Sequence, residues 1–234
     1  MAFTVNAAER MRIDASGKVG IGTGSDSLTR ELTVKLAGQA DVSIIGATNQ
    51  YAQLLFGDTD ADNKGIVAYD NTNDKLELWT SGSAAVRIDA NGHVTMPLQS
   101  SAGIQLSDQN NMATTPTTLD FDTVRFDQNS DFNTGTNTFT APVTGKYLVC
   151  VNLYMNNIDT AATYYQLYIA SSNKVYYSIF DPELSNDAEY WNMPWSAVID
   201  MDASDTVYFR MNQSGGTAQT DINQVSTVSI SLLH

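Results

Sequence analysis

The chain has 234 residues, a single cysteine and a formal net charge of −14 at pH 7. This length allows two domains or one large all-β unit. The excess of acid argues against nucleic acid and against anionic membrane surfaces as partners, because both require a basic face on the protein. A lone Cys150 excludes an intramolecular disulfide framework.

The N-terminal stretch MAFTVNAAER lacks the basic segment and following apolar segment of a secretory signal. No run approaches the roughly 18 consecutive apolar residues of a membrane-spanning helix. We therefore expect neither Sec export nor membrane insertion. A protein of this kind that acts outside the cell would be made in the cytoplasm and released by lysis.

Strand signals dominate the first half of the chain. Short apolar or alternating segments are separated by Gly, Asn, Asp and Ser clusters, as is typical of β-structure. The expected strands are LTVKL (32–36), VSIIGAT (42–48), YAQLLFG (51–57), GIVAYD (65–70), KLELWT (75–80), VRID (86–89) and HVTM (93–96). No long stretch of helical period interrupts them, so the sequence predicts an all-β fold.

The phrase RIDASGKVGIG, from Arg12, returns in altered form as RIDANGHVTMP from Arg87. In each copy Asp stands at the first position of a turn and Gly at the fourth, which predicts a type I turn followed by a left-handed Gly. Each phrase is thus expected to be one hairpin of a repeated architecture. Because only a short segment precedes the first copy, we also expect the chain to be a piece of a longer one.

These segments resemble the repeated β segments of bacteriophage tail fibres and related virion appendages, which carry an MRI-x-x-x-G-x-VGIGT phrase. The resemblance covers residues 1–98, and VTMP in place of VGIG suggests that the second copy ends the array. It implies an intertwined homotrimeric hairpin shaft in which three identical chains bury one another's apolar faces and hide their strand edges.

A polar stretch, residues 99–118, is expected to be a connector that contains one strand, GIQL. A long strand over 146–155 follows, apolar on both faces and therefore expected to be covered twice. The remaining expected strands are TYYQLYIA (163–170), KVYYSIF (174–180), WSAVIDM (195–201), TVYFRMN (206–212) and STVSISLL (226–233). Their number suits a jelly roll.

Residues 119–234 resemble the C1q/tumour-necrosis-factor superfamily. FTAPVTGKY matches its signature, DASDTVYFRM its GD-x-V strand and STVSISLL its last strand, although Ser204 stands where that family has Gly. The resemblance implies a C1q-like jelly-roll β-sandwich, a homotrimer and a role in binding proteins, glycans or cell surfaces. It also implies that the domain is not an enzyme.

Catalytic residues are not expected. The only histidines are His93, in the second hairpin, and His234, the last residue, so a histidine triad or His-rich metal site is disfavoured. Cys150 lies in an apolar strand without a basic neighbour and is expected to be inert.

The acidic loop before EYWNMPW is the expected receptor-binding region. Tyr190 and Trp191 could expose flat rings to sugars, beside Asp187 and Glu189. The alternative is that both rings pack inward or between subunits. No cofactor is expected, apart from a structural calcium ion whose candidate ligands are Asp200, Asp202 and Asp205.

Our leading hypothesis is a homotrimeric virion fibre protein whose tip attaches to a host-surface receptor, a glycan or a protein. Its other partners would be upstream fibre or virion proteins. The alternative is a purely structural module that trimerises, caps or decorates the fibre. A glycan depolymerase is a third, weaker reading, since no pair of carboxylates stands out.

Overall fold

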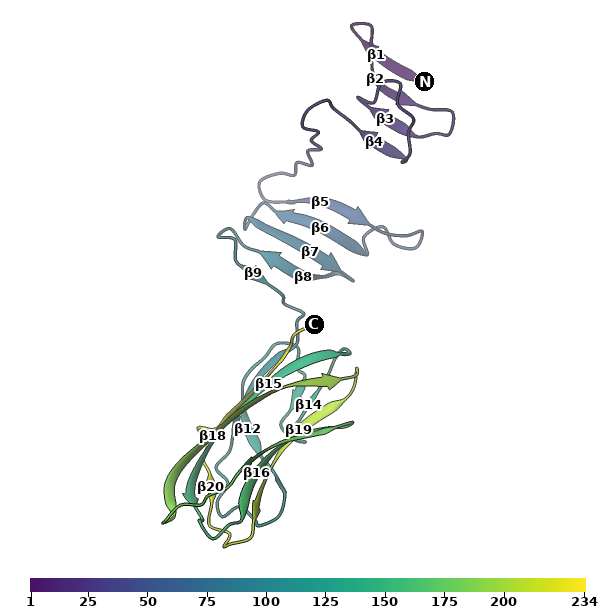
Figure 1. Cartoon of the computed structure of the whole chain (residues 1–234). Helices are drawn as coiled ribbons and strands as arrows, with labels where there is room; N and C mark the ends of the chain where they lie inside the picture. The colour runs from purple at the N-terminus through teal and green to yellow at the C-terminus, as the bar shows by residue number, and fades with distance from the viewer.

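The computed structural model describes residues 1–234, and all its regular elements are β-strands. Figure 1 shows three parts in a row: a small N-terminal sheet, a second sheet, and a two-layered sandwich, with the C-terminus at the end of the sandwich nearest the second sheet. None of its elements is a helix that could cross a bilayer. The predicted all-β fold class is confirmed.

The first two parts are single-layer sheets that follow the chain order. The first contains β1 (Ala2–Val5), β2 (Ala8–Ile13), β3 (Val19–Ile21) and β4 (Leu32–Val34). The second contains β5 (Tyr51–Phe56), β6 (Gly65–Asp70), β7 (Lys75–Thr80), β8 (Ser83–Ile88) and β9 (Val94–Thr95). Neighbouring strands are antiparallel except β3 and β4, which are parallel.

The two copies of the repeated phrase form the same turn. In β2–β3 the backbone N–H of Gly17 donates to the carbonyl of Asp14 at 3.1 Å, and in β8–β9 Gly92 donates to Asp89 at 2.9 Å. Both glycines have positive φ, +84° and +85°, a conformation that a residue with a Cβ rarely adopts. The predicted hairpin geometry is confirmed for both copies.

One expected strand is absent: residues 41–47 form no regular structure. Val42 and Ile45 are exposed, and Ile44 lies over the second sheet in a shallow apolar hollow. A strand needs neighbours for its backbone N–H and C=O groups, and one chain supplies none here. The apolar pattern of this segment was therefore misleading about its local structure.

The sandwich consists of two packed sheets. One has the strand order β12 (Phe121–Asp127), β10 (Ser101–Leu106), β21 (Thr227–Leu232), β15 (Gly145–Ile158), β18 (Ala188–Met201), with β20 (Asp221–Ile222) beside β15. The other has the order β13 (Phe132–Asn133), β14 (Thr138–Thr140), β19 (Thr206–Ser214), β16 (Tyr164–Ser171), β17 (Val175–Phe180), with β11 (Thr117–Thr118) beside β19.

The connector predicted over 99–118 is wrong in its bounds, although its expected strand GIQL is confirmed as part of β10. Strand β10 lies between β12 and β21, and its Ile104 and Leu106 are completely buried in the core. The sandwich therefore begins near residue 101 and not at 119. Ser, Asn, Gln and Thr residues on both sides of β10 make the segment look polar, but the apolar side chains of β10 alternate and pack inward.

The single large core lies between the two sheets of the sandwich, and no residue before Ala102 contributes to it. Strand β15 shows why. Its odd-numbered side chains from Tyr147 to Met155 are buried, whereas Leu148, Cys150 and Tyr154 on the other face are only half-buried. The prediction that both faces are apolar holds, but within one chain only one face is covered.

The second sheet has no core of its own. One face carries apolar side chains in register across the strands, and most of them remain well exposed. This face, called here the shaft face, consists of Leu54, Val67, Leu78 and Val86 in one row and Ala52, Tyr69, Leu76 and Ile88 in the next. On the opposite face the buried carboxylate of Glu77 accepts hydrogen bonds from Arg87 Nε at 2.8 Å and Trp79 Nε1 at 3.0 Å.

Candidate functional site

The strand directions decide which loops meet at the far end of the sandwich. Ile158, at the end of β15, pairs with Ala188 at the start of β18, whereas Gly145 pairs with Met201 at the other end. The loops 159–163, 181–187 and 215–220 therefore gather at one end. In Figure 1 this end, close to β20, points away from β1–β9.

A polar depression, called here the distal hollow, lies among these loops. It consists of two adjoining pockets of about 400 and 290 Å³ that share Asn157 and Glu189. The first is lined by Asn111, Asn157, Asp187, Ala188, Glu189 and Gln219. The second adds Asp108, Asn110, Asn156, Asp221, Ile222 and Asn223. The hollow holds four carboxylates and no basic side chain.

Asp187 fixes one wall of the distal hollow. Its carboxylate accepts hydrogen bonds from the backbone N–H of Thr160 at 3.0 Å, the Thr160 hydroxyl at 2.7 Å and Gln219 Nε2 at 3.1 Å. These bonds, the one from the Thr160 backbone first, lower the pKa of Asp187 below its ordinary value of 3.8. The bonds join three loops, so this wall is preorganised.

Asp221 fixes the other wall. It accepts hydrogen bonds from Asn157 Nδ2 at 2.9 Å and from the backbone N–H of Asn111 at 2.7 Å. Asn157 itself has a φ of +55°, in the left-handed region, which asparagine tolerates better than most residues. Polar groups from three distant segments thus converge here at the surface.

Three of the four predicted receptor-binding residues lie on this part of the surface. Asp187 and Glu189 line the distal hollow. Tyr190 is 58% exposed on the outer face of β18, with its ring centroid 6.2 Å from that of Tyr154. Its hydrogen bond to Glu189 raises the pKa of the Tyr190 phenol. Receptor binding by these three residues stays a prediction.

Trp191 faces the other way. Its ring stacks on Phe180 with a centroid distance of 4.3 Å and an interplanar angle of 15°, and Phe180 in turn stacks on Tyr165. Side chains alternate along β18, so an exposed Tyr190 requires an inward Trp191. The expectation of an exposed Trp191 is wrong, and the alternative of inward packing holds for this residue.

The sequence did not indicate Asn111, Asn157, Gln219 or Asp221 as site residues. They are separated from Asp187 by long stretches of chain and carry no motif. Their only signal is that Asn, Asp and Gln are concentrated in the segments that become loops at one end.

The three predicted metal ligands do not come together. Asp200 forms an ion pair with Lys146 at 2.6 Å. The Asp205 carboxylate accepts hydrogen bonds from the Ser172 hydroxyl at 2.6 Å, from Asn173 Nδ2 at 2.9 Å and from the backbone N–H of Asp202 at 2.9 Å. The chain contains no cluster of three or more metal-ligating side chains. These residues therefore do not fit a calcium site within one chain.

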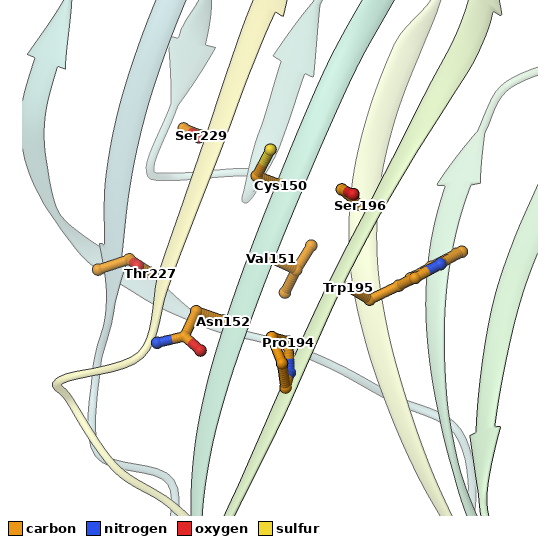
Figure 2. A pocket seen from close by; sticks show the side chains of 8 residues that line it. All are labelled: Cys150, Val151, Asn152, Pro194, Trp195, Ser196, Thr227 and Ser229. Carbon is orange, nitrogen blue, oxygen red and sulfur yellow. The ribbon is translucent and has the colours of Figure 1, made fainter.

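A second hollow of about 580 Å³ lies on the outer face of β21, β15 and β18. Figure 2 shows that Cys150, Ser196 and Ser229 from these three strands lie close together there. They occupy one row of the sheet, which continues to Gly103 on β10. The lining contains no charged residue. Because these side chains are small, another chain can approach the backbone of the sheet closely here.

Comparison with known proteins agrees with this architecture. A model of the C1q domain family matches residues 101–233. The chain belongs to the C1q family. The predicted C1q-like jelly roll is thus confirmed, and the match includes β10, in line with the corrected boundary.

Two solved structures illustrate the similarity of the C1q domain. The globular domain of zebrafish complement 1qA protein is 17% identical over 58% of this chain and 98% of its own, with a TM-score of 0.46. Murine APRIL is 8% identical over 58% of this chain and 99% of its own, with a TM-score of 0.43. No curated protein matched the sequence.

Proposed function

We propose that this protein is a homotrimeric fibre protein of a bacteriophage virion that attaches to a host-surface glycan through its C1q domain. The observation that carries the proposal is the distal hollow. It lies at the end of the C1q domain that points away from the N-terminal sheets (Figure 1). A cell surface meeting the free end of such a fibre would contact this region first.

The chemistry of the distal hollow suits a neutral or amino sugar. Carboxylates such as Glu189 and Asp221 accept hydrogen bonds from sugar hydroxyls, and amides such as Asn157 and Gln219 both donate and accept. The adjacent Tyr190 offers a flat apolar face for a sugar ring. Four carboxylates without a base would repel an anionic polysaccharide.

Trimerisation is proposed because one chain leaves too much apolar surface uncovered. The shaft face of the second sheet and the uncharged hollow at Cys150 both lack a cover. Identical chains related by a threefold axis would bury both and protect the sheet edges. Three equivalent weak sites at one tip would then gain avidity through effective concentration.

The proposal is tested with a panel of neutral, amino and acidic bacterial surface glycans and the fluorescently labelled full-length protein. Glu189→Gln preserves the shape of the hollow but removes a charge, and we expect it to weaken binding to the glycans that the wild type captures. Asp200→Asn, on the same strand at the opposite end, is the matched control and should bind normally. Equal binding by both variants would contradict the role of the distal hollow.

A purely structural role is the second candidate, favoured by the uncharged small-residue face at Cys150 (Figure 2). In that case the protein trimerises or caps the fibre, and another component binds the receptor. This candidate predicts no glycan binding by the wild type, together with trimer dissociation on Ser229→Arg. Immunogold labelling of virions would test the proposed location in either case.

A further inference from the structure

A second surface of the C1q domain, distinct from the distal hollow, carries features of a binding face. It is the outer face of β19, β16 and β17. The strand register places Tyr208 beside Ala170 and Val175, Arg210 beside Tyr168 and Tyr177, and Asn212 beside Gln166 and Ile179. We call these nine residues the lateral face. Tyr177, Ile179 and Val175 remain well exposed on it.

Arg210 lies at the centre of the lateral face between two aromatic rings. Its guanidinium carbon is 5.3 Å from the ring centroid of Tyr168 and 5.5 Å from that of Tyr208. Such stacking holds the planar group in a fixed orientation. The Nε atom is buried and has no hydrogen-bond partner. A desolvated donor without an acceptor is costly, so this arginine is only partly satisfied by its own chain.

The charge around Arg210 is unusual for this protein. The chain contains 26 acids and 12 bases, yet Arg210 takes part in none of its six ion pairs. No other residue of the lateral face is charged. This is a neutral aromatic surface with one unpaired cation, in contrast to the acidic distal hollow.

An occupant of the lateral face must therefore combine a flat apolar surface with an anion. Tyrosine rings accept the apolar face of a sugar, and a guanidinium pairs with a carboxylate through two parallel hydrogen bonds. Gln166 and Asn212 in the next row are buried beneath this surface, and the Gln166 side-chain carbonyl accepts a hydrogen bond from the Tyr168 hydroxyl, which holds the Tyr168 ring beside Arg210. Each requirement is met by a carboxylated pyranose.

We propose that the lateral face binds a carboxylate-bearing sugar, such as a uronic acid residue of a polysaccharide, with Arg210 as the anion-binding residue. The site lies on the flank of the domain and takes a ligand of opposite charge preference to the distal hollow. Loss of ligand binding at one of the two sites would leave binding at the other site unchanged. A fibre with both sites could hold an acidic capsule along its flank and a neutral glycan at its tip.

The test uses full-length protein and isothermal titration with tri-galacturonic acid, compared with its methyl-esterified, uncharged counterpart. We expect the acid to bind at least tenfold more tightly than the ester. Arg210→Lys keeps the charge but loses the two-pronged geometry and should weaken binding of the acid about tenfold. Equal affinity for acid and ester, or an unaffected Arg210→Lys variant, would overturn the proposal.

A second variant removes any ambiguity from misfolding. Tyr177 is 59% exposed, so Tyr177→Ala should leave the fold and the thermal midpoint unchanged while weakening the acid severalfold. Val225→Ala, similarly exposed on the loop before β21, is the control and should bind as the wild type does. Unchanged affinity in Tyr177→Ala would also overturn the proposal.

Discussion

Leu78 provides the sharpest test of the proposed trimeric shaft. It lies in the middle of the shaft face, with Val67 and Val86 opposite it on the neighbouring strands, and is 44% exposed in one chain. Complete burial of a leucine side chain contributes about 2 kcal/mol, so covering the remaining area contributes about 1 kcal/mol. Leu54, Val67 and Leu76 have similar exposure. Together the four contribute about 4 kcal/mol per chain, or about 12 kcal/mol per trimer.

Leu78→Asp should abolish this contribution. An unpaired carboxylate in an apolar interface costs roughly 3–5 kcal/mol, and in a trimer three such charges would also repel one another. That sum matches or exceeds what the shaft face supplies. We therefore expect the second sheet to open while the C1q domain, which has its own core, stays folded.

The assay is hydrogen exchange measured by mass spectrometry on peptides covering 65–80. The amides of this segment should exchange about 100-fold faster in Leu78→Asp than in the wild type, the factor that corresponds to about 3 kcal/mol. Leu184→Asp makes the same change at a residue that is 40% exposed in a distal loop, and it is the control. The amides of residues 65–80 should exchange as slowly in this variant as in the wild type. Equal protection in both variants would refute the burial of the shaft face.

Three further predictions concern single side chains. Trp191→Ala should lower the free energy of unfolding of the C1q domain by about 3 kcal/mol because it removes the ring that stacks on Phe180. Tyr190→Ala should change the same free energy by less than about 0.5 kcal/mol. Thermal melts compare the two variants, and similar midpoints would contradict the inward placement of Trp191. Arg87→Ala leaves the buried carboxylate of Glu77 with one donor fewer; because Arg87 is partly exposed and screened by solvent, we expect a loss of about 1–2 kcal/mol in the second sheet, and faster exchange in 65–80 would report it. Because the pKa of Asp187 is lowered in the folded protein, its ionised form stabilises the distal loops when the pH is above the ordinary pKa of 3.8. This contribution is lost as the pH falls through the lowered pKa. Amide exchange in the loops, corrected for its intrinsic pH dependence, should therefore rise below about pH 4 in the wild type and should rise less in Asp187→Asn.

Local features were predictable from the sequence because their causes are local. An Asp and a Gly at fixed spacing specify the turns at Asp14–Gly17 and Asp89–Gly92, whatever the rest of the chain does. The alternation along β15 likewise predicted a long strand with two apolar faces. The C1q resemblance predicted the jelly roll as a whole, but its predicted start at residue 119 was too late, since β10 is short and is surrounded by polar residues.

The candidate site depended on long-range pairing, which no local pattern encodes. Alternation shows that Tyr190 and Trp191 face opposite sides of a strand, but only the pairing of β18 with β15 decides that Trp191 faces the core. In the same way, the strand directions alone bring Asn111, Asp187 and Gln219 to one end of the sandwich. The sequence by itself determined most of the strands, the two repeated turns and the family, because these follow from neighbouring residues. The tertiary structure decided which side chains meet, because the pairing of strands distant in sequence sets which face of each strand is buried.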